Sequence, residues 1–232
     1  MDPALALRER RFFYGRNFRD LQETTFNFAM PGTVQSSGQL TKRKRPSTKE
    51  KSLKRARSES SEEDPQAQIL FLENAIFESK ENYNNITKLI KTLQRETEDG
   101  DVVVVAAISL CRVFTRLMVS GEMVKKPTGS EKDAVVMRWL RERFSEYKIE
   151  LLKLLGEDGV ESTALTLCMR LLKTEGEHLR PGQDNTFPAP FLADIVGILL
   201  TTENDGSTRL EFSQKYVEEY DDVRFYTFEA VE

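Results

Sequence analysis

The chain is poor in the side chains that most often carry out catalysis or bind metals. It has one histidine, His178, and two cysteines, Cys111 and Cys168, among 232 residues. The GxxxxGK[ST], GxGxxG, GxSxG and HExxH patterns are all missing, so the residues that define nucleotide, dinucleotide, acyl-transfer and zinc-hydrolase sites are absent. We expect no catalytic residue, no metal and no cofactor.

Disulfides and membrane spans also lack their usual signals. The two cysteines lie in apolar helical patterns without a nearby Cys or His, which indicates small core side chains in a reducing compartment. The longest apolar run, residues 102–119, is interrupted by Arg112 and Arg116, so we expect a buried amphipathic helix and no membrane contact. The N-terminus has no apolar h-region, which argues against a signal peptide.

Positive charge is concentrated in one short segment. Nine Lys or Arg residues and one Glu lie between Lys42 and Arg57, whereas residues 65–232 carry a net charge of −9. So many like charges with so few apolar groups predict that residues 1–65 form a disordered basic leader. The acidic remainder, residues 66–232, is a poor general binder of phosphate backbone, so we expect its partners to be proteins.

The basic segment resembles a bipartite nuclear import signal, in which two separated clusters bind an import carrier. Eight residues separate Arg45 from Lys54. The predicted signal residues are Lys42, Arg43, Lys44, Arg45, Lys54, Arg55 and Arg57. The alternative is a general polycation that contacts RNA or DNA backbone, and both interpretations indicate a protein of the nucleus.

A serine cluster follows the basic segment directly. It contains Ser58, Ser60 and Ser61, and the last two have an acidic residue three positions later, a pattern typical of acidophilic kinase sites. Phosphorylation would add about −1.5 to −2 charges per site. Beside the basic clusters, that charge would weaken contact with a carrier or with nucleic acid.

From residue 66 onward the apolar spacing is helical. It predicts seven helices: one over residues 69–77, one over 86–93, one starting at Asp101, a long one over 132–155, and others over about 160–174, 191–200 and 209–220. The terminal VRFYTFEAV comes closest to strand-like alternation but is too short to change the class. The sequence therefore predicts an all-α domain.

Two of these segments repeat a pattern 57 residues apart. Ala107, Leu110 and Cys111 align with Ala164, Leu167 and Cys168. Small residues followed by an aliphatic face are what stacked helix pairs of the HEAT or armadillo kind need, so we expect an α-solenoid. A chance alignment of two amphipathic helices is the alternative.

Five collinear segments resemble the N-terminal region of the fungal nucleolar complex protein four family. They are residues 69–94, 105–123, 139–155, 162–178 and 218–228. The resemblance implies an α-solenoid scaffold, without catalysis, in the nucleolar assembly of the small ribosomal subunit and the processing of its precursor RNA. It further implies protein partners in the small-subunit processome. From its charge, we expect the basic leader to offer a contact for precursor RNA as well.

The resemblance also implies a part that this sequence does not contain. Members of the family continue into a CCAAT-binding-factor domain, which is thought to dock on nucleolar protein fourteen, whereas this sequence ends at Glu232. The second functional hypothesis is a nuclear adaptor of transcription or chromatin with the same solenoid. An RNA-modifying enzyme without a familiar motif is the third.

Overall fold

The computed structural model describes Phe13 and residues 64–95, 100–126, 129–179, 187–203 and 206–232. Contacts divide the chain into two units, residues 16–63 and the remainder, and the helices that the structure describes belong to the remainder. Those are α1 (Pro65–Glu78), α2 (Asn85–Leu93), α3 (Gly100–Val119), α4 (Glu131–Leu155), α5 (Glu161–His178), α6 (Ala189–Thr201), α7 (Ser207–Phe212) and α8 (Asp221–Val231). A 3-10 turn, η2 (Lys80–Asn84), precedes α2, and a π turn, η3 (Ser213–Val217), follows α7.

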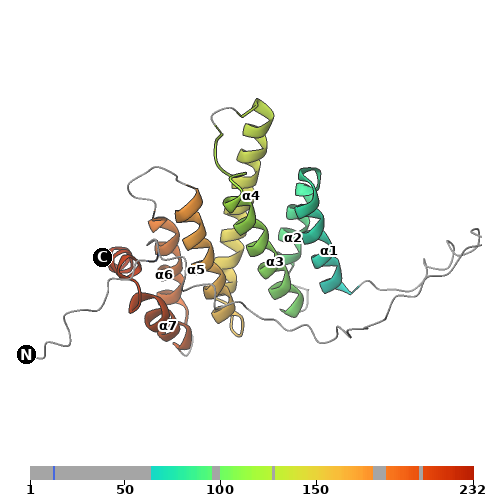
Figure 1. The fold of residues 1–232 in the computed structure, drawn as a ribbon. Coiled ribbons are helices and arrows are strands. Elements are labelled where there is room, and N and C mark those ends of the chain that lie inside the picture. The colour runs from blue at the N-terminus through green and yellow to red at the C-terminus, as the bar shows by residue number, and fades with distance from the viewer. Residues whose placement is uncertain (1–12, 14–63, 96–99, 127–128, 180–186, 204–205) are drawn as a thin grey trace, which may run out of the picture. The chain divides into compact units, whose positions relative to one another are not determined.

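The helices form two layers that alternate along the chain. In one layer α1, α3, α5 and α7 each pack on the next, and in the other α2, α4, α6 and α8 do the same. Figure 1 shows α1 to α7 following one another in a row. Each helix contacts only its near neighbours in sequence, which is the organisation of an α-solenoid. The predicted all-α solenoid is confirmed, and the described residues contain no strand.

The repeated pattern corresponds to two helices at successive positions of one layer. α3 and α5 pack directly against each other, and each buries its cysteine: Cys111 is 1% exposed and Cys168 is 0% exposed. Ala107 and Ala164 are buried as well. Small side chains at these positions let two helices approach closely.

The C-terminal end differs from the predicted seven helices. The segment 209–220 was predicted as one helix, but α7 ends at Phe212 and the chain continues as η3. The terminal residues form an additional helix, α8, which buries Val223 and stacks Tyr226 on Phe187 with ring centroids 4.1 Å apart. Those contacts come from distant residues, so local spacing could not predict them.

α3 is the central helix of the described domain. It packs against α1, α2, α4 and α5, and ten of its residues are buried. By length and composition alone it could cross a membrane, as could the core helix of many globular proteins. Its two arginines bind neighbours: Arg112 pairs with Glu73 of α1, and the Arg116 guanidinium lies 4.4 Å from the centre of the Phe77 ring.

Candidate functional site

The predicted import signal and serine cluster lie outside the described residues, so both stay predictions. Within the described ranges, no group of three or more His, Cys, Asp and Glu side chains is arranged to hold a metal ion. His178 is the last residue of α5, where a cation is favoured by the helix dipole. Its Nε2 atom lies 3.9 Å from the carboxylate of the adjacent Glu177.

The cysteines are buried against a tyrosine. Burial raises the pKa of Cys111 to about 11 and raises the pKa of Cys168 further. Burial also raises the pKa of Tyr147, whose hydroxyl donates a hydrogen bond of 2.6 Å to the carbonyl oxygen of Ala107. Thiols in such surroundings stay protonated and are poor nucleophiles. They belong to the core of the α3–α4–α5 packing.

Two ion pairs with largely buried carboxylates join neighbouring helices. Glu73 in α1, whose side chain is 6% exposed, accepts from Arg112 Nε at 2.7 Å and from Nη2 at 2.6 Å. Lys148 of α4 lies 3.1 Å from Glu175 of α5. These pairs fix the stacking of the helices.

One small cavity lies near η2 and the start of α4. Its volume is about 80 Å³, and Lys80, Glu122, Lys126 and Asp133 are among its lining residues. The Lys80 ammonium is 2.6 Å from the Glu122 carboxylate, and this hydrogen bond is the main reason that the pKa of Glu122 is lowered. The cavity is far smaller than the roughly 300–1,000 Å³ typical of small-molecule sites.

The aromatic residues of α4 belong mainly to the core. Aromatic residues interleaved with arginines, as Trp139, Phe144 and Tyr147 are in this helix, can form a stacking platform for single-stranded RNA. Phe144 is 3% exposed and Tyr147 is fully buried. Trp139 is partly buried, and the Arg143 guanidinium lies 5.7 Å from its ring centre. The positions that would have to stack on bases are thus occupied by intramolecular packing.

A contact between Phe13 and the C-terminal helices was not anticipated from the sequence. Phe13 is 6% exposed. Its ring meets Tyr220 and Tyr216 edge to face, with centroids 4.9 and 6.3 Å apart. Its backbone N–H donates to Asp222 Oδ1 at 2.9 Å, and Lys173 Nζ lies 5.7 Å from the ring centre. The aromatic residues of RRFFYG were the only local signal for this contact.

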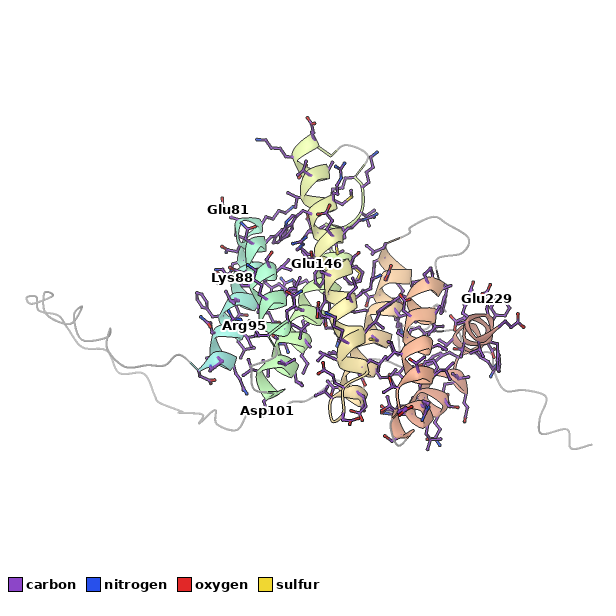
Figure 2. All side chains as sticks on the ribbon, turned by 180° about the vertical axis from the view of Figure 1, so that it is seen from behind. Glu81, Lys88, Arg95, Asp101, Glu146 and Glu229 are labelled. Atoms are coloured by element: carbon purple, nitrogen blue, oxygen red, sulfur yellow. The ribbon has the colours of Figure 1, made fainter. Side chains whose placement is uncertain are left out.

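The outer faces of the helices are covered largely by charged and polar side chains. Figure 2 shows them along the row, from Glu81 and Lys88 near its first helices to Glu229 on α8. Exposed apolar side chains occur on several helices, and the most exposed are Phe71 on α1 at 70% and Phe225 and Phe228 on α8 at 63% and 64%. Stacked helices present extended faces of the kind that repeat proteins use to bind other macromolecules.

A family model described as "Nucleolar complex protein 4-like, TPR repeats" matches residues 58–232. The chain belongs to the nucleolar complex protein 4-like family. TPR repeats, like HEAT and armadillo repeats, are stacked helix pairs, and the two alternating layers described above have that form. The match begins at Ser58, so it spans every helix of the domain.

Two curated proteins are similar to this nucleolar complex protein 4-like chain. An uncharacterised protein of Schizosaccharomyces pombe is 31% identical over 163 residues, and a nucleolar complex protein 4 homolog of Gallus gallus is 26% identical over 172 residues. Each alignment covers 68% of this chain and 33% of the relative. The chain therefore corresponds to about a third of the length of these relatives. No solved structure matches it.

Proposed function

We propose that this chain is a non-enzymatic scaffold in the nucleolus that takes part in assembling the small ribosomal subunit and processing its precursor RNA. Membership of the nucleolar complex protein 4-like family, over residues 58–232, is the observation that carries the proposal. The chicken relative is named as a nucleolar complex protein. The helical faces would hold protein components of the small-subunit processome, and the acidic charge of residues 65–232 favours protein over RNA as their partner.

The basic leader supplies the second half of the proposal. Its two clusters, residues 42–45 and 54–57, would bring the chain into the nucleus on an import carrier. Once there, the same Lys and Arg side chains could neutralise phosphates of precursor RNA. Phosphate groups on Ser58, Ser60 and Ser61 would oppose both contacts.

The test is sedimentation of the tagged chain from fission yeast nuclear extract in a sucrose gradient. We expect a fraction of the chain to travel with small-subunit precursors and to recover precursor ribosomal RNA. A chain that stays at the top of the gradient and is enriched on chromatin would instead support a transcription or chromatin adaptor.

A second arm separates import from assembly. The seven basic residues of the import signal are replaced by Gln in one variant. A control variant carries Gln at five other basic residues of the leader: Arg8, Arg10, Arg11, Arg16 and Arg19. We expect only the first variant to remain cytoplasmic. An unrelated import signal fused to the first variant should restore its nuclear entry. Sedimentation restored at the same time would assign the clusters to import alone, and sedimentation still lost would assign them a contact on the particle.

A further inference from the structure

The contact of Phe13 with the C-terminal helices joins residues about two hundred positions apart. The site is formed where three elements meet: α5 contributes Lys173, η3 contributes Tyr216, and the start of α8 contributes Asp222. Tyr220, between η3 and α8, makes the closest ring contact. The Phe13 side chain is only 6% exposed, so these elements cover it although they lie far from it in sequence.

We propose that α5, η3 and α8 form a docking site for an aromatic residue in an arginine-rich peptide, and that the chain's own N-terminal segment, residues 8–20, is its occupant through Phe13.

The geometry provides both an apolar and a polar part of the recognition. Two edge-to-face ring contacts hold the phenyl ring, and such aromatic pairs are favourable beyond the area that they bury. Asp222 Oδ1 accepts from the backbone N–H of Phe13 at 2.9 Å and also from the N–H of Val223 at 2.9 Å. The carboxylate is thereby fixed by its own helix start, so it is positioned to receive the peptide backbone.

The π turn contributes a ring to the docking site. Tyr216 of η3 contacts two other rings. Its ring centroid lies 6.3 Å from that of Phe13 and 6.1 Å from that of Phe212. Burial is the main reason that the pKa of Tyr216 is raised to about 12. π turns inside helices are frequent at functional sites because the extra residue per turn changes where side chains point.

Charge complements the apolar contact. Residues 8–20 contain five Arg and two acidic residues, whereas the rim residues 218–222 contain four carboxylates in five positions. Opposite charges of this kind increase the rate of encounter and disfavour wrong partners. The occupant therefore needs both an aromatic residue and surrounding arginines, and residues 8–20 provide both.

The test uses full-length chains and a fluorescent peptide of residues 6–19. The wild-type chain, a Phe13→Ala chain and a Phe18→Ala chain are titrated with it by anisotropy. We expect the peptide to bind the Phe13→Ala chain about tenfold or more tightly than the other two, because a tethered segment competes at millimolar effective concentration. A peptide that carries Phe13→Ala should bind the Phe13→Ala chain at least about tenfold more weakly than the wild-type peptide does. A peptide that carries Phe18→Ala should bind it as tightly as the wild-type peptide.

Equal binding of the peptide to all three chains, or equal binding of both mutant peptides, would overturn the proposal and indicate contact by charge alone. A second readout does not depend on the peptide. Trypsin should cleave the Phe13→Ala chain after Arg11 and Arg16 several-fold faster than the wild-type or Phe18→Ala chain. Unchanged cleavage rates would contradict docking even if Phe13→Ala disturbed the fold elsewhere.

Discussion

At the scale of single residues, the domain depends on polar groups that are buried with a partner. Glu73 is the clearest example, because its carboxylate is almost fully buried and both of its oxygens bind Arg112. The Arg112 side chain is 43% exposed, so its charge is partly screened by water. Removing Arg112 therefore destabilises the domain mainly because the Glu73 carboxylate is left buried without its partner, and less because the attraction between the two charges is lost.

We predict that Arg112→Ala lowers the free energy of unfolding by about 1–3 kcal/mol, below the ~3–5 kcal/mol found for fully buried pairs. Arg116→Ala, one turn along the same helix, removes the contact with Phe77 and should cost about 0.5–1 kcal/mol. Urea unfolding measures both. The double change Glu73→Leu with Arg112→Leu should recover most of the loss, and a double variant as unstable as Arg112→Ala would show that packing of the arginine stem dominates.

The buried thiols allow a prediction about access. Cys111 and Cys168 are 1% and 0% exposed, and their raised pKa values keep them protonated. At pH 8 we expect a thiol reagent to modify neither residue in the folded chain and both in urea. Mass spectrometry at intervals checks this. Fast modification of either residue in the native protein would mean that the α3–α5 interface opens locally.

The same groups predict the response to alkali. Because the folded pKa of Cys168 is raised, the unfolded chain loses its thiol proton first as pH rises above about 9, and the folded state becomes less favoured. Above about pH 9, the free energy of unfolding should therefore fall by about 1.4 kcal/mol per pH unit for each buried thiol. The fall ends when the pH reaches the pKa of that thiol in the folded chain. Unfolding curves at pH 8, 9, 10 and 11 measure the slope. Cys168→Ala should flatten it, and an unchanged slope would assign the effect to Tyr147 and other groups.

At the scale of helices, the residues next to each helix end determine where the helix begins or stops. α4 begins with a capping box, in which Ser130 and Asp133 exchange side-chain and backbone hydrogen bonds. α3 ends in a Schellman turn: Glu122 N–H donates to Leu117 O at 3.1 Å, and Gly121 N–H donates to Met118 O at 3.0 Å. Gly121 has a φ of 72°, a conformation that glycine adopts without strain.

Two glycines should respond in opposite directions to the same change. Gly121→Ala places a Cβ in open space but in a left-handed conformation, so we expect a loss of about 1–2 kcal/mol. Gly197 lies within α6 with equally open space, and Gly197→Ala should raise the free energy of unfolding by about 0.5–1 kcal/mol. Thermal unfolding gives both signs. Equal effects of the two changes would contradict the role assigned to the Gly121 conformation.

Helix positions could be predicted where the apolar spacing is regular. The long helix was expected over residues 132–155 and is Glu131–Leu155, since its apolar face repeats through its length. The change from α7 to η3 could not be predicted, because it depends on how Tyr216 packs against Phe13 and Phe212. The Phe13 site and the Arg112–Glu73 pair were missed for the same reason. Each joins residues from separate elements, and local patterns contain no information about such pairs.

At the scale of the whole domain, the solenoid contacts decide how instability spreads. Among the described elements, neither α1 nor α2 contacts α6, α7 or α8. In a repeat architecture of this kind, a destabilising change in one helix is expected to weaken mainly the helices that contact it. Ile76 in α1 and Ile195 in α6 are 3% and 0% exposed. They offer the same chemical change, Ile→Ala, at the two ends of the row.

We predict that Ile76→Ala speeds amide hydrogen exchange in α1, α2 and α3 and leaves α6 and α8 close to wild type, whereas Ile195→Ala does the reverse. Each change removes about 2–5 kcal/mol of local packing, so protection factors near the altered helix should fall by at least tenfold, since 1.4 kcal/mol corresponds to a factor of ten. Exchange with peptide-level mass spectrometry resolves the helices. If both variants accelerate exchange equally in every helix, the domain unfolds as a single cooperative unit and α3, which contacts four helices, transmits the defect across the row.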